Sequence, residues 1–148
     1  MEANQEVEPP FQFHLETYET EIRPDWIDYN EHMNDSAYAI VLTEANEEFL
    51  KFANLGSDYH SSTGCTVYTV EAHIFYLAEV HQSDVLHART YIDELDTKKI
   101  RLKTELIRRD GKLAARSEFL YLHFDQNASS VKPFPDGVFA FLSTLASG

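Results

Sequence analysis

The residues best suited to a chemical reaction lie in one short stretch, residues 24–38. Its side chains of chemical interest are Asp28, His32, Asn34, Trp26 and Tyr29. A helical pattern begins directly after this stretch. The first turn of a helix leaves backbone N–H groups unpaired and carries the positive end of the helix dipole, so it can hold an oxygen that gains negative charge during a reaction. We therefore expect Asp28 to attack, or to activate water to attack, a carbonyl group polarised by this helix start.

The helix that must position Asp28 is predicted over residues 36–54. Apolar residues recur there at steps of three and four, and they are Ala37, Ile40, Val41, Ala45, Phe49, Phe52 and Ala53. This spacing is typical of one buried face of a helix of about five turns. Asn34, Asp35 and Ser36 are alternative N-caps, and Gly56 is the expected stop.

Strand patterns occupy most of the remaining chain. Alternation predicts a first strand at residues 18–23, and β-branched and aromatic residues predict four more at residues 66–77, 83–93, 99–109 and 112–125. Asp110-Gly111 is a two-residue hairpin signal between the last two strands. Residues 56–64 have the composition of a loop, and residues 137–145 that of a short apolar helix. The order predicts an α+β fold whose four later strands form an antiparallel meander.

Length and charge narrow the possible classes. The 148 residues suit one domain, which we place at residues 11–148 after an acidic, flexible tail at residues 1–10. A net charge of −13 argues against attraction to nucleic acid or an anionic membrane. The sequence has no apolar run of membrane-spanning length and does not begin like a secretory signal, so we expect a cytoplasmic protein.

A metal site is not expected from the sequence. The histidines are scattered, as His14, His60, His73, His81, His87 and His123 show, and the only cysteine is Cys65. Metal sites are usually marked by close helical spacing of histidines or by paired cysteines. The sequence also has no Gly-rich phosphate loop and no Gly-x-Ser-x-Gly motif, which argues against nucleotide hydrolysis and serine hydrolase chemistry.

A second subunit is expected because one helix cannot cover both faces of such a sheet. The strands carry apolar residues at both odd and even positions, which point to opposite faces of a sheet. In the strand predicted at residues 66–77, for example, Val67 and Phe75 are at odd positions and Val70 and Ile74 at even ones. Some of this surface must be buried by another chain. We therefore expect at least a dimer.

The spacing around Asp28 resembles a known family. An Asp followed by His32 four residues later, by Asn34 two residues further on and by a long helix resembles the hot-dog fold acyl-CoA thioesterases of the 4-hydroxybenzoyl-CoA thioesterase type. The resemblance implies a curled antiparallel sheet wrapped around the helix, and active sites between the subunits of a homodimer or tetramer. It places Asp28 at the catalytic aspartate and implies an acyl-CoA substrate, with coenzyme A as part of the substrate and no separate cofactor.

Two stretches narrow the resemblance. Residues 25–30, DWIDYN, and residues 68–74, YTVEAHI, are similar to the betainyl-CoA thioesterases of carnitine breakdown. Those relatives usually carry Gly before the histidine, where this chain has Glu31. A glycine at that position suggests a backbone conformation that other residues adopt only with strain.

For each of the other candidate site residues, the sequence allows two interpretations. His32 and Asn34 either orient Asp28 or the acyl group, or His32 caps the loop. Glu71 and His73 lie on one face of a strand, which is either exposed to water or part of a pocket for a trimethylammonium group. The candidate pocket residues are Glu71, His73, Trp26, Tyr29, Tyr68 and Tyr76. Because Tyr68 and Tyr76 have the opposite parity from Glu71, not all of them can share one pocket within a single subunit.

Three functions remain possible from the sequence. The first is hydrolysis of betainyl-CoA, the second hydrolysis of a fatty or aromatic acyl-CoA, and the third non-catalytic binding of an acyl-CoA. A cluster of basic residues is either a solvated face or a contact for the phosphates of coenzyme A. Its members are Lys98, Lys99, Arg101, Lys103, Arg108, Arg109, Lys112 and Arg116.

Overall fold

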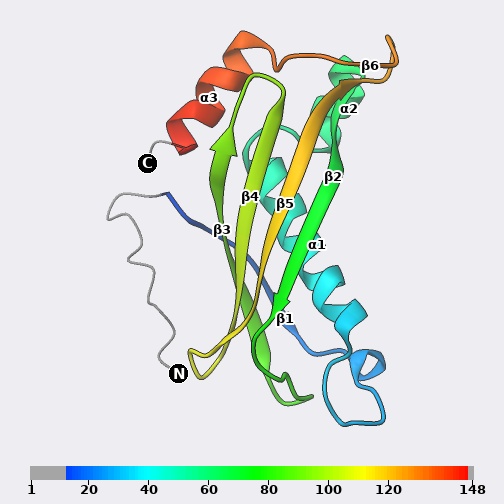
Figure 1. Ribbon diagram of the computed structural model, residues 1–148, viewed down its shortest axis with the longest axis vertical. Helices are drawn as coiled ribbons and strands as arrows, with labels where there is room; N and C mark the ends of the chain where they lie inside the picture. The colour runs from blue at the N-terminus through cyan, green and yellow to red at the C-terminus, as the bar shows by residue number, and fades with distance from the viewer. Residues whose placement is uncertain (1–12, 147–148) are drawn as a thin grey trace.

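A computed structural model describes residues 13–146 as an antiparallel sheet packed along one long helix (Figure 1). The elements are β1 (Leu15–Glu21), the 3-10 turn η1 (Pro24–Trp26), α1 (Asp35–Phe52), α2 (Ser57–Thr63), β2 (Cys65–Tyr76), β3 (Val85–Leu95), β4 (Lys99–Arg108), β5 (Leu113–Asp125), β6 (Ser130–Val131) and α3 (Asp136–Ala146). This is the α+β hot-dog arrangement that the resemblance to the acyl-CoA thioesterases implied. The predicted tail at residues 1–10 lies outside the described residues.

The predicted long helix is confirmed as α1, and Asn34 is its N-cap. The helix ends differently from the prediction. Asn54, at φ 62°, takes the left-handed conformation that reverses the chain, and the Leu55 amide donates to the Leu50 carbonyl at 2.8 Å. The left-handed residue that follows a helix is usually Gly and sometimes Asn. The prediction that Gly56 ends the helix was therefore wrong, because Asn54 takes that role.

The sheet order corrects the predicted meander. The strands lie in the order β1-β3-β4-β5-β2, so only β3, β4 and β5 are neighbours in sequence order. Strand β2 pairs with β5 at the far edge, for example Val67 with His123 and Ala72 with Phe119. The strand patterns were located correctly, but alternation along a strand does not say which strand lies beside it. The two edges of the sheet are therefore β1 and β2.

A short helix replaces the loop predicted at residues 56–64. Helix α2 is closed by Gly64, at φ 73°, whose amide donates to the His60 carbonyl at 2.9 Å. The hydroxyl of Thr63 donates to the Tyr59 carbonyl at 2.6 Å. These contacts satisfy backbone groups at the end of the helix. The segment is polar and lacks helical periodicity, and for this reason its composition indicated a loop.

The core consists of two apolar clusters, one under each half of α1. Val41, Leu42 and Leu106 belong to the cluster near the start of α1, whereas Phe49 and Leu102 belong to the cluster near its end. The predicted apolar face of the helix was partly wrong. Ile40 and Phe52 are 44% and 43% exposed, and Leu42 and Leu50 are buried in their place.

A band of buried polar residues separates the two clusters. Asn46 of α1, which is fully buried, accepts a hydrogen bond from the Thr104 hydroxyl at 2.6 Å. The hydroxyls of Thr104 and Thr90 lie 2.8 Å apart, and those of Thr90 and Thr17 lie 3.1 Å apart. This chain of contacts joins the helix to β4, β3 and β1, and it fixes the position of α1 along the sheet.

Replacing Asn46 with alanine is expected to lower the free energy of unfolding by about 1–3 kcal/mol, because the buried Thr104 hydroxyl loses its acceptor. Urea denaturation measures the effect. Thr43→Ala, on the exposed side of the same helix, is the matched control and should change stability little. An equal loss in both variants would mean that the polar band contributes nothing specific.

Candidate active site

Asp28 lies in a tight hairpin that leads directly into α1. Ile27 and Met33 form the antiparallel bridge that closes this hairpin. The Asp28 amide donates to the His32 carbonyl at 3.1 Å, and the Asp28 carbonyl accepts from the Glu31 amide at 3.0 Å. This is a three-residue loop in which a tight turn is followed by a left-handed residue. That residue is Glu31, at φ 65°.

The β4–β5 connection has the same hydrogen-bond pattern, with glycine at the corresponding position. The Arg108 amide donates to the Lys112 carbonyl at 2.9 Å, and the Gly111 amide donates to the Arg108 carbonyl at 2.9 Å. Gly111 has φ 86°. The hairpin predicted at Asp110-Gly111 is thus confirmed, although its loop has three residues and not two. The comparison also shows that Glu31 adopts a conformation for which glycine is the usual residue.

We expect Glu31→Gly to raise the free energy of unfolding by about 0.5–1 kcal/mol. A left-handed conformation costs an L-residue roughly 1–2 kcal/mol, part of which is offset by the greater freedom of glycine in the unfolded chain. The gain should appear as a higher urea midpoint with an unchanged slope. Glu31→Ala, which removes the charge but keeps the Cβ atom, should give no such gain. Equal stabilisation by both variants would assign the effect to the lost charge.

The Asp28 carboxylate is half-buried and has one defined partner. Its Oδ1 accepts from the Asn30 amide at 2.8 Å, so the side chain does cap its own turn. Among the described residues, Oδ2 has no hydrogen-bond partner. One oxygen therefore fixes the carboxylate on the hairpin, and the other is available for chemistry.

Asn34 connects the hairpin to the helix with both ends of its side chain. Its Nδ2 donates to the Trp26 carbonyl at 2.8 Å, and its Oδ1 accepts from the Ala37 amide at 2.9 Å. The Asn34 amide donates to the same Trp26 carbonyl at 2.8 Å. Asn34 thus orients the backbone that carries Asp28 relative to the helix start.

One amide at the helix start remains free. The backbone amides of the helix start, residues 34–37, are the possible oxyanion donors, but three of these already have acceptors. Asn34 donates to Trp26, Ser36 to the Asp35 carboxylate and Ala37 to Asn34. In the described part of the chain, only the Asp35 amide of this group has no acceptor. It is therefore the candidate donor to a developing oxyanion.

A groove of about 380 Å³ lies beside this helix start. It is lined by His32, Met33, Asp35, Tyr38, Tyr76, Leu77, Ala78 and Glu79. The rings of Tyr38 and Tyr76 pack edge to face at 5.2 Å, and the Tyr38 hydroxyl donates to the Ala78 carbonyl at 2.8 Å. Burial, with a smaller contribution from Glu79, raises the pKa of Tyr38, which keeps this hydroxyl protonated. The groove has aromatic and apolar walls, with carboxylates at its rim.

The predicted substrate-binding residues are only partly brought together in one chain. Tyr76 lines the groove, whereas Trp26 is buried in the core and is only 6% exposed. Tyr29 stands at the tip of the hairpin and is 94% exposed. The ring of His32 contacts Glu79 and His81 and, within residues 13–146, makes no hydrogen bond to the Asp28 carboxylate. Its predicted orienting role therefore stays a prediction.

A β-bulge changes which residues of β2 share a face. The register shifts between Thr69 and Glu71, so that Tyr68 faces Leu122 and Glu71 faces Leu120. Tyr68, contrary to the parity argument, therefore lies on the same face as Glu71 and not on the opposite one.

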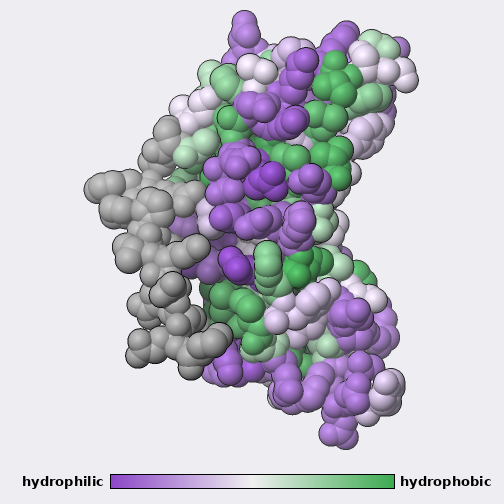
Figure 2. Space-filling view, viewed as in Figure 1, coloured by the Kyte–Doolittle hydropathy of each residue, from purple (hydrophilic) through white to green (hydrophobic). Residues whose placement is uncertain are grey.

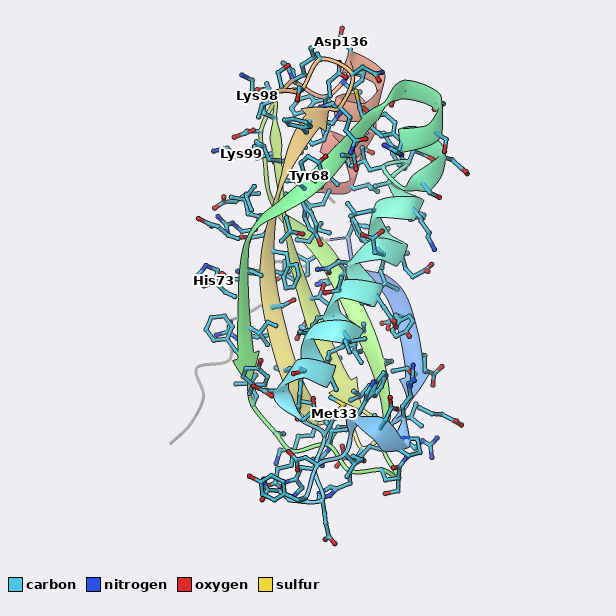
Figure 3. All side chains as sticks on the ribbon, turned by 90° about the vertical axis from the view of Figure 1, so that its right-hand side faces the viewer. Met33, Tyr68, His73, Lys98, Lys99 and Asp136 are labelled. Atoms are coloured by element: carbon cyan, nitrogen blue, oxygen red, sulfur yellow. The ribbon has the colours of Figure 1, made fainter. Side chains whose placement is uncertain are left out.

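This face of β2 is directed away from α1. His73 extends to that side (Figure 3), and the Glu71 carboxylate pairs with Arg101 at 3.8 Å. Hydrophilic side chains gather over the middle of the same side of the sheet (Figure 2). Tyr68, Glu71 and His73 are thus separated from the groove of their own subunit.

The cluster of basic residues is divided by the fold. Arg101 and Lys103 pair with carboxylates on neighbouring strands, and Arg108 pairs with Asp110. Lys98 and Lys99 lie at the opposite end of the molecule from Met33 (Figure 3) and, among the described residues, form no ion pair. In one subunit, the free lysines are therefore far from the groove.

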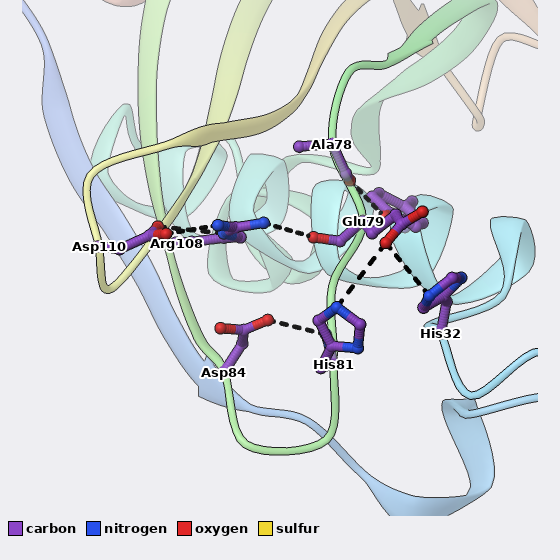
Figure 4. A network of polar contacts seen from close by, with 8 residues as sticks. His32, Ala78, Glu79, His81, Asp84, Arg108 and Asp110 are labelled. Carbon is purple, nitrogen blue, oxygen red and sulfur yellow. Dashed lines mark hydrogen bonds and ion pairs between the residues drawn. The ribbon is translucent and has the colours of Figure 1, made fainter.

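Sequence reasoning missed two residues near the site. These are Glu79 and His81, whereas the Asp35 amide was among the expected donors. The Nε2 atoms of His32 and His81 lie 3.2 Å and 3.8 Å from the same carboxylate oxygen of Glu79 (Figure 4). His32 and the other two residues are distant in the sequence, and no spacing rule links them.

Comparisons with known proteins agree with this geometry. The family model described as the thioesterase-like superfamily matches residues 22–142. A Pseudomonas aeruginosa protein named betainyl-CoA thioesterase is 31% identical over 133 residues, which cover 89% of this chain and 84% of that protein. An Agrobacterium fabrum protein named L-carnitine dehydrogenase/betainyl-CoA thioesterase is 34% identical over 131 residues, or 88% of this chain. The match spans only 27% of that longer relative.

A solved structure also has the same fold. A Staphylococcus aureus protein described in complex with CoA superposes with a TM-score of 0.83 at 25% identity, covering 88% of this chain and 82% of that one. In addition, no helix of residues 13–146 is long and apolar enough to cross a membrane.

Proposed function

The chain belongs to the thioesterase-like superfamily, and from this premise we propose that it hydrolyses the thioester bond of an acyl-CoA to a free acid and coenzyme A. One observation carries the proposal. A half-buried carboxylate on a rigid hairpin lies directly before a helix start whose Asp35 amide is free, and a groove opens beside that amide. Coenzyme A is then part of the substrate, and the reaction needs no separate cofactor.

In the proposed reaction, the Asp35 amide donates to the thioester carbonyl oxygen as negative charge develops on it. Asp28 acts in one of two ways. It attacks the carbonyl carbon, the C–S bond breaks to release the CoA thiolate, and water hydrolyses the resulting anhydride. Alternatively, it takes a proton from a water molecule that attacks the carbon, and the same C–S bond breaks. Both routes require an ionised Asp28 and consume one water molecule.

We propose betaine as the acyl group. Two relatives that are 31% and 34% identical have betainyl-CoA thioesterase in their names. The aromatic face of Tyr76, which lines the groove and is 52% exposed, can attract a trimethylammonium group by roughly 0.5–2 kcal/mol. The net charge of −13 also favours a cationic acyl group over an anionic one.

We further propose that the working site lies between two copies of the chain that pair through β2. This edge strand is exposed on both faces, since Tyr68, Val70 and Tyr76 are 42%, 50% and 52% exposed, and Leu77, directly after the strand, is 49% exposed. A long edge with unpaired backbone groups and apolar side chains is a template for pairing. Antiparallel pairing about a two-fold axis would bring the first half of the second copy's β2 beside the groove. Tyr68 and the free lysines could then reach the substrate from the second copy.

Substrate preference tests the acyl group. Betainyl-CoA and 3,3-dimethylbutanoyl-CoA have the same shape, but only the first is charged. We expect kcat/KM to favour betainyl-CoA at least tenfold, which corresponds to roughly 1.4 kcal/mol. The assay follows thiol release with a thiol-reactive dye. Equal values would remove betaine and favour a fatty or aromatic acyl group. Binding of both compounds without thiol release would indicate a non-catalytic acyl-CoA-binding protein.

A further inference from the structure

We propose that His32, Glu79 and His81 form a binding site for a divalent transition-metal ion such as Zn²⁺. His32 comes from the hairpin before α1, and the other two residues come from the connection between β2 and β3 (Figure 4). Their ligand atoms all lie within 4.8 Å of one another. This site is separate from the chemistry proposed for Asp28, and its test does not depend on hydrolysis.

The distances suit a tetrahedral ion. Zn²⁺ binds imidazole nitrogen and carboxylate oxygen at about 2.0–2.2 Å, so two ligand atoms of a tetrahedral site lie about 3.3–3.5 Å apart. The Glu79 oxygen is 3.2 Å from His32 Nε2 and 3.8 Å from His81 Nε2. The two imidazole rings meet edge to face with their centroids 4.9 Å apart, and both Nε2 atoms lie near the same carboxylate oxygen. Small rotations of the half-buried His32 side chain and of the two exposed ones would complete the geometry.

The backbone that carries the three ligands is already fixed. The Met33 amide donates to the Val80 carbonyl at 2.8 Å, which joins the two segments between the ligands. The His81 amide donates to the Asp84 carboxylate at 2.7 Å, and Arg108 donates to the Glu79 carbonyl at 2.9 Å. Asp110 in turn holds the Arg108 guanidinium at 3.0 Å. A site preorganised in this way loses little conformational freedom when an ion binds.

An ion-pair cluster is the simpler alternative, and it explains the geometry less well. The Glu79 side chain is 64% exposed, and an exposed ion pair contributes little stability. Two protonated imidazoles that share one carboxylate oxygen would also repel each other. Two neutral imidazoles and a carboxylate, in contrast, are the ligand set that suits Zn²⁺ and related ions, whereas Mg²⁺ and Ca²⁺ prefer oxygen alone.

Such an ion would link the hairpin of Asp28 to the connection between β2 and β3. His32 and Glu79 both line the groove, and His32 lies at the end of the three-residue loop that Asp28 begins. Three protein ligands leave at least one position of the ion open to water.

Titration of the full-length, tag-free protein with Co²⁺ and then with Zn²⁺ tests the site. Co²⁺ should give visible absorption bands that saturate at one ion per chain and disappear when Zn²⁺ displaces it. His81→Ala and Glu79→Gln should each weaken Zn²⁺ binding at least tenfold, measured by competition with a chromophoric chelator. His60→Ala is the matched control, because His60 is an exposed histidine bonded to Gln126. It should leave the affinity unchanged.

Two results would overturn the metal site. The first is the absence of saturable binding of either ion at one per chain. The second is equal Zn²⁺ affinity in the wild type and in both ligand variants, which would place the ion elsewhere on this acidic protein. The folded state of each variant is checked by its urea midpoint, so that lost binding is not confused with unfolding.

Discussion

Replacement of Asp28 with asparagine is expected to lower kcat for acyl-CoA hydrolysis by about 10²–10⁴-fold. This is the range typically attributed to a general base, and loss of a nucleophile would not be smaller. Asparagine keeps a side-chain oxygen that can still accept from the Asn30 amide, so the hairpin should retain its shape. The variant therefore removes the charge and the basicity of the carboxylate without removing its structural contact.

Asp25→Asn is the matched control for this experiment. Asp25 is an exposed carboxylate in the same segment, where it pairs with Arg23 at 3.1 Å. Its replacement should change kcat less than twofold. An Asp28→Asn protein with unchanged kcat, or an equal loss in both variants, would remove Asp28 from the reaction. Retained affinity for the CoA thioester in the slow variant would show that binding and catalysis separate at this residue.

A charge in the middle of the exposed edge strand should dissociate the proposed dimer. Ala72 is an exposed residue of β2. It pairs with Phe119 of β5, so the opposite edge of β2 is left for a second copy. Ala72→Glu would place like charges close together across a two-fold strand pair, which is destabilising. We expect the variant to elute as a monomer in size-exclusion chromatography with light scattering. Its thioesterase activity should fall at least tenfold, because the second copy no longer completes the groove.

The control for the edge strand is Thr144→Glu, at an exposed position of α3. It adds the same charge to the protein away from β2 and should leave both mass and activity unchanged. A wild-type chain that is monomeric and fully active would contradict the inter-subunit site. So would an Ala72→Glu monomer that retains wild-type turnover.

Local patterns were sufficient to predict most of the secondary structure and the position of the candidate carboxylate. The three- and four-residue spacing located α1, and the β-branched and aromatic residues located β3 to β5. The sequence left three caps open, and the structure selects Asn34, which bonds both Trp26 and Ala37. The glycine expected before His32 also had a physical basis, because Glu31 occupies a left-handed position.

The features that sequence reasoning missed depend on contacts between distant segments. The place of β2 beside β5 is set by packing, and the bulge after Thr69 reverses the parity on which the pocket prediction relied. The meeting of His32 with Glu79 and His81 requires the β2–β3 connection to fold back onto the hairpin. No periodicity within either segment indicates this approach.

The most direct test is to incubate betainyl-CoA with the purified wild-type chain and to measure both products. We expect free CoA and betaine to appear in equal amounts, with kcat in the ordinary enzymatic range of about 1–10³ s⁻¹. Tight binding of betainyl-CoA and of other acyl-CoAs, with no acid formed above the rate without protein, would contradict thioester hydrolysis and leave an acyl-CoA-binding protein.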